Sequence, residues 1–248
     1  MNILLTNDDG YNAEGILVLQ EVLSKEHDVY ILAPKENCSA TSHHITMRSN
    51  LEILQISEKV YACSGFPSDC SFVALKSSLF SVKFDCVISG INNGSNIGTD
   101  IVYSGTCAAA REASLLGLPS IAVSLDYYKQ KIESFYPIAE FIRKNLSKLI
   151  RLCKNSSKKV FVNINALGIL QYKGVVFTNL LSERKYDDAV NLFSKENGFT
   201  TSNREGPLIN PVLKETDEDA VHNGFISISL VLSEPVCSDS VEEIEFSV

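Results

Sequence analysis

The sequence predicts an α/β fold built on a parallel sheet, followed by a β-rich extension at the C-terminus. Apolar, strand-like segments alternate with segments of helical periodicity over the first two thirds of the chain, and this alternation stops near residue 165. Such alternation is typical of parallel strands joined by helices. The chain has 248 residues, which is long enough to bury a sizeable core.

The first unit predicts a strand, a helix and a second strand. NILLT is an apolar run typical of a buried strand, and DVYILAP is a second such run, closed by Pro34. Between them, three apolar residues recur at helical spacing: Ile16, Leu19 and Leu23. We therefore expect a β-α-β unit at the N-terminus.

The same pattern continues as far as residue 165. Strands are predicted in VYACSG, FDCVISG, PSIAVSL and KKVFVNIN, and helices after Pro67, in TCAAAREASLLG and in the amphipathic segment IESFYPIAEFIRKNLSKLIRLC. The last of these helices should begin near Pro137, because proline is favoured in the first turn of a helix. These elements together predict a parallel sheet with helical crossovers.

A different organisation is expected after residue 165. KGVVFTNLL and GFISISLVL are strand-like, but the residues between them are polar and lack helical periodicity, so we predict an antiparallel extension. We divide the chain into a core of residues 1–165 and an extension of residues 166–248 that packs on the core rather than folding independently. The acidic tail CSDSVEEIEFSV is expected to be a solvated terminus.

Composition limits the classes of partner. The net charge of −8 argues against long nucleic acids, whereas a small anionic ligand remains compatible with an acidic protein. No apolar stretch approaches the roughly 20 residues of a membrane span, and no basic leader precedes an apolar segment. Seven cysteines without C-x-x-C spacing fit a reducing compartment. We therefore expect an unprocessed cytoplasmic protein.

The segment NDDG ends the first predicted strand. Ligands of open parallel sheets gather outside the carboxyl ends of the strands, so Asp8 and Asp9 are expected at a site. Gly10 permits a turn that lets both carboxylates converge on one divalent ion of oxygen preference, such as Mg²⁺ or Mn²⁺. The alternative is that Asp8 or Asp9 caps the helix beginning near Ala13.

The segment SGINNGSNIGTDIVYSGTCAAAREA is the richest in polar site residues. Asn92 and Asn96 lie in an Asn- and Gly-rich loop that directly follows an apolar strand, which suits a cation and an anion together. Ser104, Gly105 and Thr106 then open a helix whose N–H groups and hydroxyls could face a phosphate. A plain N-cap by Ser104 or Thr106 is the alternative, and both interpretations can hold together.

The loop APKENCSATSHH follows the second strand. Ser39 is a candidate hydroxyl ligand, although the residues alone do not distinguish it from Thr41 or Ser42. His43 and His44 are adjacent and lack the i, i+4 spacing of helical metal pairs, so we interpret them as loop histidines.

SGFPSDCSF precedes a predicted helix. Ser68 or Asp69 stands just before the apolar run, which is typical of a helix N-cap. Asp69 is therefore interpreted as structural rather than catalytic.

Five spaced motifs together resemble the SurE (survival protein E) family of metal-dependent 5′/3′-nucleotidases: ILLTNDDG, the AP loop with its serine, SGINNGSN, YSGT and TDEDAVHNGFISIS. The resemblance covers nearly the whole chain in order. It implies a Rossmann-like, three-layer α/β core with a C-terminal extension that forms homodimers or homotetramers. It also implies hydrolysis of nucleoside 5′-monophosphates, with 3′-monophosphates and short polyphosphate as further substrates.

The resemblance assigns roles to individual residues. It makes four residues the ligands of one divalent ion, with Mg²⁺ or Mn²⁺ preferred and Co²⁺ as a third candidate: Asp8, Asp9, Ser39 and Asn92. Four further residues match positions near the bound phosphate: Asn96, Ser104, Gly105 and Thr106. Asp8 or Asp9 is also a candidate general base, and the sequence does not choose between them. Ser39-Ala40 replaces the family's usual Ser-Gly, which restricts a backbone angle beside the metal.

Three other functions fit part of this pattern. A receiver-like, phospho-accepting signalling domain also ends its first strand in an acidic pair, but it needs a third aspartate that the strands ending in ILAP and YACSG lack. A haloacid-dehalogenase-type phosphatase needs Asp-x-Asp, and Gly10 stands where the second acid belongs. A noncatalytic nucleotide-binding module is compatible with the same loops and would bind AMP without releasing phosphate.

Overall fold

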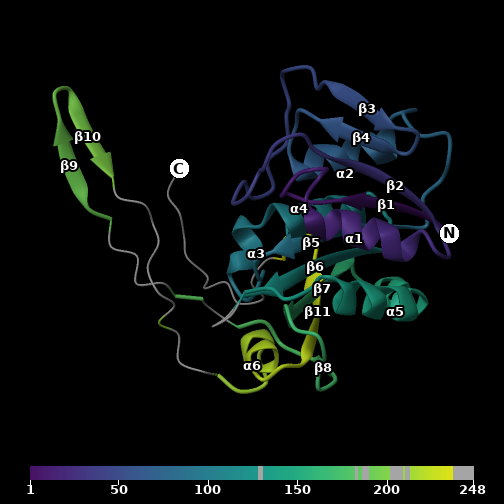
Figure 1. The fold of residues 1–248 in the computed structure, drawn as a ribbon. Coiled ribbons are helices and arrows are strands. Elements are labelled where there is room, and N and C mark those ends of the chain that lie inside the picture. The colour runs from purple at the N-terminus through teal and green to yellow at the C-terminus, as the bar shows by residue number, and fades with distance from the viewer. Residues whose placement is uncertain (128–130, 182–183, 186–189, 202–208, 210–212, 237–248) are drawn as a thin grey trace, which may run out of the picture.

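The computed structural model describes residues 1–127, 131–181, 184–185, 190–201, 209 and 213–236 (Figure 1). The N-terminal part contains β1 (Asn2–Thr6), α1 (Glu14–Leu23), β2 (Asp28–Pro34), β3 (Ile53–Ser57), β4 (Val60–Cys63), α2 (Pro67–Lys76) and β5 (Cys86–Asn93). The middle contains α3 (Asp100–Tyr103), α4 (Gly105–Leu115), β6 (Ser120–Asp126), α5 (Tyr136–Asn155) and β7 (Val160–Leu167). The C-terminal part contains β8 (Val175–Phe177), β9 (Leu192–Lys195), β10 (Gly198–Thr201), α6 (Asp217–His222) and β11 (Ile226–Leu232).

One large sheet forms the centre of the molecule, with the strand order β3-β4-β2-β1-β5-β6-β7-β11-β8. The strands from β4 to β7 in this order are parallel. The chain moves outward from β1 to β2 and β4, and then returns to the other side of β1 with β5. The order therefore reverses between β1 and β5, which is where open α/β sheets bind their ligands.

Helices cover both faces of this sheet and make the three layers. Helices α1 and α5 pack together on one face, and α2 and α4 pack together on the other (Figure 1). Successive residues of β1 point to opposite faces: Leu5 joins the core under α1 and α5, whereas Leu4 joins the core beneath α2. Phe161 of β7, fully buried, packs with the small residues of α4.

These observations confirm the predicted α/β class, and the predicted strands and helices up to β7 are all present. Pro137 stands in the first turn of α5, as predicted. The core sheet is not wholly parallel, because β3 pairs antiparallel with β4 at one edge. The sequence did not indicate this hairpin, since β3 is largely exposed and therefore lacks a continuous apolar pattern.

The C-terminal part differs in two respects from the antiparallel extension that the sequence predicted. Strand β11 is antiparallel to β7, as expected, but β8 pairs with β11 in parallel. Helix α6 was missed because its six residues, DEDAVH, are too few for a periodic apolar pattern. Strands β9 and β10 form a separate antiparallel hairpin. The acidic tail lies outside the described residues.

Within the described part of the chain, no helix combines the length and the apolar character that crossing a membrane requires.

Gly15 sets how closely α1 approaches the sheet. A Cβ atom at this position would lie 2.0 Å from the carbonyl oxygen of Ile91 in β5. We expect Gly15→Ala to lower the free energy of unfolding by about 1–3 kcal/mol. The energetic cost of this overlap should exceed the gain in helix propensity, which is at most ~1 kcal/mol. Urea unfolding would measure the change.

Leu17→Ala is the matched control, since Leu17 lies in the same helix with a side chain that is 43% exposed. It should alter the free energy of unfolding by less than about 1 kcal/mol. A Gly15→Ala variant as stable as the wild type would contradict the proposed close approach.

Candidate functional site

The NDDG turn is closed by the side chain of Asn7. This buried amide donates to the carbonyl oxygen of Gly10 at 2.8 Å and accepts from the Gly10 N–H at 3.2 Å. Gly10 has a φ of +109°, a region that favours glycine. The strand therefore ends abruptly, and the two aspartates leave it at the switch point of the sheet.

Asp8 is buried against the first turn of α4. Its Oδ1 accepts from the Thr106 hydroxyl at 2.5 Å, and its Oδ2 accepts from the Thr106 N–H at 3.2 Å. A Cβ atom on Gly105 would lie only 2.8 Å from the Asp8 Cβ, so this glycine allows the close approach. Asp8 is 3% exposed.

Asp9 is only partly buried and faces the other side of the turn. Its Oδ2 accepts from the Asn93 N–H at 3.2 Å, and its Oδ1 lies 3.4 Å from Nδ2 of Asn37. The Asn37 side chain also accepts from the Ser39 N–H at 2.9 Å. Asp9 thus connects the end of β5 with the loop that carries Ser39.

Ser39 and Ala40 form an exposed bend in that loop. The Ser39 hydroxyl makes no hydrogen bond to any described residue, whereas its N–H is bonded to Asn37. Ala40 has a φ of +56°, in the left-handed region where alanine is strained. The backbone beside Ser39 therefore adopts the conformation that glycine accommodates most easily. Cys38 links this loop to the turn through its N–H, which donates to the Asp8 carbonyl oxygen at 2.7 Å.

Asn92 lies in β5 at the same edge of the sheet. Its Nδ2 donates to the carbonyl oxygen of Gly94 at 2.8 Å. With the amide in this orientation, Oδ1 accepts no hydrogen bond from a described residue. The structure thus gathers the turn, the Ser39 loop, the end of β5 and the start of α4 at one place.

The start of α4 is capped by Ser104, whose hydroxyl accepts from the Cys107 N–H at 3.0 Å. This confirms the N-cap interpretation for Ser104. Thr106 does not cap the helix, because its hydroxyl is bonded to Asp8. The alternative role of Asp8 or Asp9 as a cap of α1 is wrong, since the N-cap residue there is Ala13, without a side-chain hydrogen bond.

Asn96 lies deeper than the other candidates and is 5% exposed. Its Nδ2 donates to the Ser124 hydroxyl at 2.7 Å. Its backbone is held by two asparagines of β7: the N–H donates to Asn165 Oδ1, and the carbonyl oxygen accepts from Asn163 and Asn165. The Asn-rich loop is therefore anchored at Asn96 by side chains that point out of the sheet.

A second anchor holds the far end of this loop. Asp217 of α6 accepts from the Gly98 N–H at 2.8 Å, and Arg184 donates to the Ser95 hydroxyl at 2.9 Å and to Asp100 at 2.8 Å. These contacts join the C-terminal part of the chain to the candidate site. Among them, Asp217 belongs to the motif TDEDAVHNGFISIS that the sequence singled out.

Asp69 is structural, as expected, but it is not the N-cap. It lies in the first turn of α2, where its Oδ2 accepts from the Phe66 N–H at 2.9 Å. It also accepts from the N–H and the hydroxyl of Thr46. His43 lies in the loop after β2, with Nε2 2.9 Å from Glu112 Oε2. Neither residue contacts Asp8 or Asp9 through a described hydrogen bond.

Burial makes the aspartate pair costly to charge. Desolvation, aided by the Asp9 charge and opposed by Thr106, raises the pKa of Asp8 to about 6. Burial also raises the pKa of Asp9, opposed by the Asn93 N–H. None of the ion pairs between described residues includes Asp8 or Asp9. The described residues therefore leave the negative charge of this pair without a basic partner.

The donor set fits a divalent ion of oxygen preference. It comprises two carboxylates without a basic partner, one hydroxyl without a hydrogen bond and one amide oxygen, which are typical ligands of such ions. No cluster of three or more His, Cys, Asp and Glu side chains that could hold a metal occurs among the described residues. Ser39 and Asn92 offer neutral oxygen ligands beside the two carboxylates.

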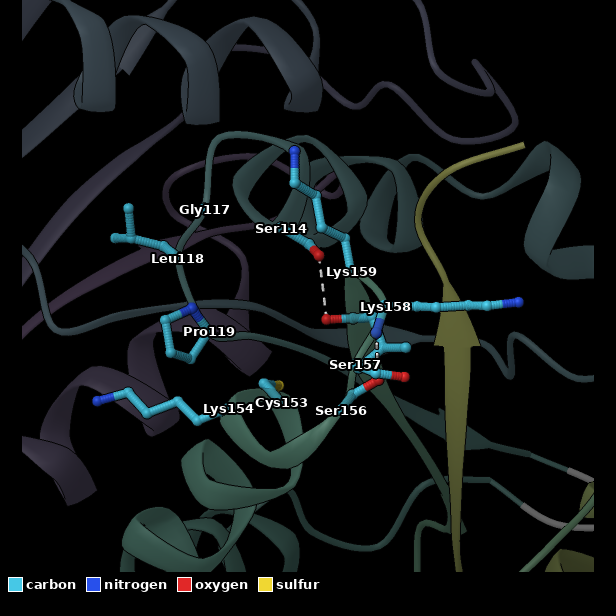
Figure 2. Close-up of a pocket in the computed structure, with 11 residues that line it drawn as sticks. Ser114, Gly117, Leu118, Pro119, Cys153, Lys154, Ser156, Ser157, Lys158 and Lys159 are labelled. Carbon is cyan, nitrogen blue, oxygen red and sulfur yellow. Dashed lines mark hydrogen bonds between the residues drawn. The ribbon is translucent and has the colours of Figure 1, made fainter. Parts of the chain in front are cut away.

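A pocket of about 270 Å³ lies at the opposite, amino-terminal edge of the strands, between the segments that precede β6 and β7. Figure 2 shows that its three lysines, Lys154, Lys158 and Lys159, point in different directions. The Nζ atom of Lys159 is bonded to the Leu115 carbonyl oxygen at 3.0 Å. These cations do not converge on a common anion, so we assign no site to this pocket.

Comparison with known proteins identifies the family of the chain. The model of the family Survival protein SurE matches residues 3–187. The chain belongs to the SurE family. The 5′-nucleotidase SurE of Alkaliphilus metalliredigens (strain QYMF) is 39% identical over 237 residues, which cover 92% of this chain and 91% of the relative. The 5′-nucleotidase SurE of Desulfitobacterium hafniense (strain DSM 10664 / DCB-2) is 39% identical over 249 residues, which cover 99% of this chain and 94% of the relative.

A solved structure agrees with this assignment. The crystal structure of the SurE protein from Aquifex aeolicus matches with a TM-score of 0.80 and 30% identity, and the match covers 95% of each chain. The SurE resemblance and the fold class predicted from the sequence are therefore both confirmed.

Two residues of this SurE site were missed at first, although a local rule indicates both. Asn7 stands three residues before Gly10, and Asn37 stands two residues before Ser39; asparagine at such spacing bonds to the backbone ahead of it. The contact of Asp8 with Thr106 spans 98 residues, so no local rule could have indicated it.

The raised pKa of Asp8 predicts an effect on stability. Its pKa is higher in the folded than in the unfolded chain, so its charge opposes folding fully above about pH 6 and not at all below about pH 4. Asp8→Asn removes this penalty. In EDTA at pH 7.5 we expect the variant to be more stable by about 1–2 kcal/mol, after loss of one hydrogen bond is subtracted.

Urea unfolding in EDTA at pH 7.5 and pH 5 measures this difference, which should shrink at the lower pH. Asp28→Asn is the control, because Asp28 is exposed and Lys59 lowers its pKa. An Asp8→Asn effect that is the same at both pH values would rule out the raised pKa as its cause.

Proposed function

We propose that this SurE family member is a metal-dependent phosphomonoesterase that hydrolyses nucleoside 5′-monophosphates to nucleoside and phosphate. Its relatives in Alkaliphilus metalliredigens and Desulfitobacterium hafniense carry the name 5′-nucleotidase SurE. The observation that carries the metal dependence is the aspartate pair, with Asp8 buried and Asp9 partly buried, beside a hydroxyl and an amide oxygen that accept no hydrogen bond from a described residue. Nucleoside 3′-monophosphates and short polyphosphate are proposed as further substrates.

One divalent ion would be held by Asp8, Asp9, Ser39 and Asn92. Mg²⁺ and Mn²⁺ are the first candidates, and Co²⁺ is the third, because all three accept oxygen ligands. When bound, such an ion polarises a phosphoryl oxygen and acidifies water. Asp8 must be ionised to bind it, so we expect the affinity to fall as the pH drops below about 6.

The chain's own residues would orient the phosphate and move the proton. The Thr106 N–H is bonded to Asp8 and the Cys107 N–H to Ser104. The Gly105 N–H and the Ser104 hydroxyl would therefore donate to phosphate oxygens at the positive end of the helix, while Thr106 holds Asp8 beside them. Asn96 would hold the Asn-rich loop near the phosphate through its anchored backbone. Asp9 is the less buried of the two aspartates and is therefore more open to water, so we assign proton transfer to Asp9 rather than to Asp8.

The test is phosphate release from a panel of nucleoside 5′- and 3′-monophosphates and polyphosphate, after EDTA treatment and re-addition of Mg²⁺, Mn²⁺ or Co²⁺. We expect loss with EDTA and rescue by at least one ion. Asp8→Asn should lower kcat/KM at least about 100-fold, since it removes a ligand of the ion that stabilises transition-state charge.

Asp28→Asn serves again as the control and should retain activity, because Asp28 is an exposed residue at the start of β2, far along the strand from its carboxyl end. Unchanged turnover of Asp8→Asn with Mn²⁺ supplied would contradict the proposal. Binding of AMP without phosphate release by the wild type would favour the noncatalytic nucleotide-binding module instead.

We also propose a division of labour along the chain, with residues 1–165 as the core that carries the site and residues 166–248 as an oligomerisation extension. The support is the hairpin of β9 and β10, which projects away from the body of the molecule (Figure 1). It exposes three large apolar side chains by 53–70%: Leu192, Phe193 and Phe199. An isolated two-stranded hairpin is only marginally stable, so a second copy of the chain is the proposed partner.

This assembly predicts a homodimer or homotetramer rather than a species of 27.3 kDa. The double variant Phe193→Ser and Phe199→Ser should reduce the mass measured by size-exclusion chromatography with light scattering. Leu54→Ser, an exposed apolar residue of β3, is the control and should keep the wild-type mass. A monomeric wild type would refute the assembly.

We propose the cytoplasm as the compartment. The six cysteines in the described residues are all free thiols, which fits a reducing environment.

A further inference from the structure

A second cavity lies beside the candidate metal site, on the face of the sheet covered by α1 and α5. It has a volume of about 660 Å³ and is lined by Glu14, Asn93, Tyr127, Lys131, Ile132 and Phe135. Glu14 begins α1, Asn93 ends β5, and Tyr127 directly follows β6. The cavity therefore opens at the carboxyl ends of the strands, the same edge that carries Asp8 and Asp9.

Asn93 joins this cavity to the candidate metal site. Its N–H donates to Asp9 Oδ2 at 3.2 Å, and it directly follows Asn92. A phosphate bound between the proposed metal ion and the start of α4 would thus lie next to the cavity. The cavity could then receive the group that is esterified to this phosphate.

The lining suits a flat ligand with apolar faces and a polar rim. Tyr127 is 61% exposed, and no ring of another described residue stacks on it. Ile132 and the buried Phe135 supply apolar surface. Glu14 and Lys131 supply an acceptor and a donor, which can read the amino, carbonyl and ring-nitrogen groups of a heterocycle.

The Tyr127 ring is supported from below by the Asn-rich loop. A Cβ atom on Gly94 would lie 3.8 Å from Tyr127 Cε1, so the ring packs beside the backbone of that glycine. Because Tyr127 directly follows β6, one end of its backbone is held by the central sheet. The volume of the cavity falls within the roughly 300–1,000 Å³ typical of small-molecule sites.

We propose that this cavity is the nucleobase subsite of the enzyme and that the base stacks on Tyr127. This inference rests on the proposed nucleotidase function, since it places the leaving nucleoside of the same reaction. The subsite makes the enzyme discriminate a nucleotide from the same sugar phosphate without a base.

The test compares kcat/KM for AMP and for ribose 5-phosphate, which differ only by the base and its glycosidic bond. We expect the wild type to prefer AMP. Tyr127→Ala should lower the ratio of the two kcat/KM values about 10-fold, because stacking of a base on an aromatic ring supports a difference of this order. Tyr127→Phe keeps the ring and should keep the ratio.

Tyr136→Ala is the matched control, since Tyr136 is an exposed tyrosine at the start of α5 that does not line the cavity. It should leave the ratio at the wild-type value. A loss of folding in Tyr127→Ala would lower both kcat/KM values and keep the ratio, so its far-UV circular dichroism must match that of the wild type. Tyr127→Leu, which keeps an apolar side chain without the ring, is the second variant and should lower the ratio as Tyr127→Ala does.

A direct measurement separates this proposal from the proposed function. Saturation-transfer NMR with adenosine in EDTA needs neither metal nor turnover, and the signal seen with the wild type should be lost in Tyr127→Ala. A wild type that hydrolyses AMP but has an unchanged ratio and an unchanged adenosine signal in Tyr127→Ala would overturn the subsite and leave the nucleotidase function intact.

Failure of the wild type to hydrolyse any nucleotide would instead refute the function, and the adenosine signal would still decide the subsite. A Tyr127→Ala variant with an altered oligomeric mass and an unaltered ratio would identify the cavity as an interface between copies and overturn the proposal.

Discussion

The structure depends on the burial of one carboxylate against the first turn of a helix. Asp8 is 3% exposed, and both of its oxygens accept hydrogen bonds from Thr106. Gly105 permits the approach, because any larger residue would overlap the Asp8 side chain. This contact ties the end of β1 to the start of α4, and the backbone of the Ser39 loop is bonded to the same turn through Cys38. The candidate site is assembled around a charge that is costly to bury.

Strain and unfavourable charge concentrate at this place, whereas the surrounding scaffold is well packed. Burial raises the pKa of Asp8 and Asp9, and Ala40 has a φ of +56°. By contrast, most apolar residues of the strands beneath the site are fully buried, and Asn163 and Asn165 of β7 satisfy the backbone of Asn96. A stable sheet thus holds groups that would be unfavourable without a bound cation, as is common where stability is given up for function.

In the proposed reaction, the two faces of the sheet would recognise different parts of the substrate. The start of α4, with the proposed phosphate donors, lies on one face, and the cavity of Tyr127 and Phe135 lies on the face of α1 and α5. Asp9 lies between them through its bond to Asn93. The C-terminal part contributes from a distance, because Arg184 and Asp217 hold the loop that carries Asn96. Substitution of either residue should therefore displace the loop at the candidate site, although neither residue lines the site.

The sequence by itself determined the elements and the family. Apolar periodicity predicted the strands and helices up to β7 other than β3 and α3, and the residue types offered Ser104 or Thr106 as a cap of α4. The motifs from NDDG to TDEDAVHNGFISIS indicated the SurE family. All of these features depend on neighbouring residues. Only the tertiary structure decided that Thr106 bonds to Asp8, that β8 runs parallel to β11, and that Asn93 connects Asp9 to a cavity. Such contacts join residues far apart in the chain, and their geometry follows from strand order and register, which local periodicity does not encode.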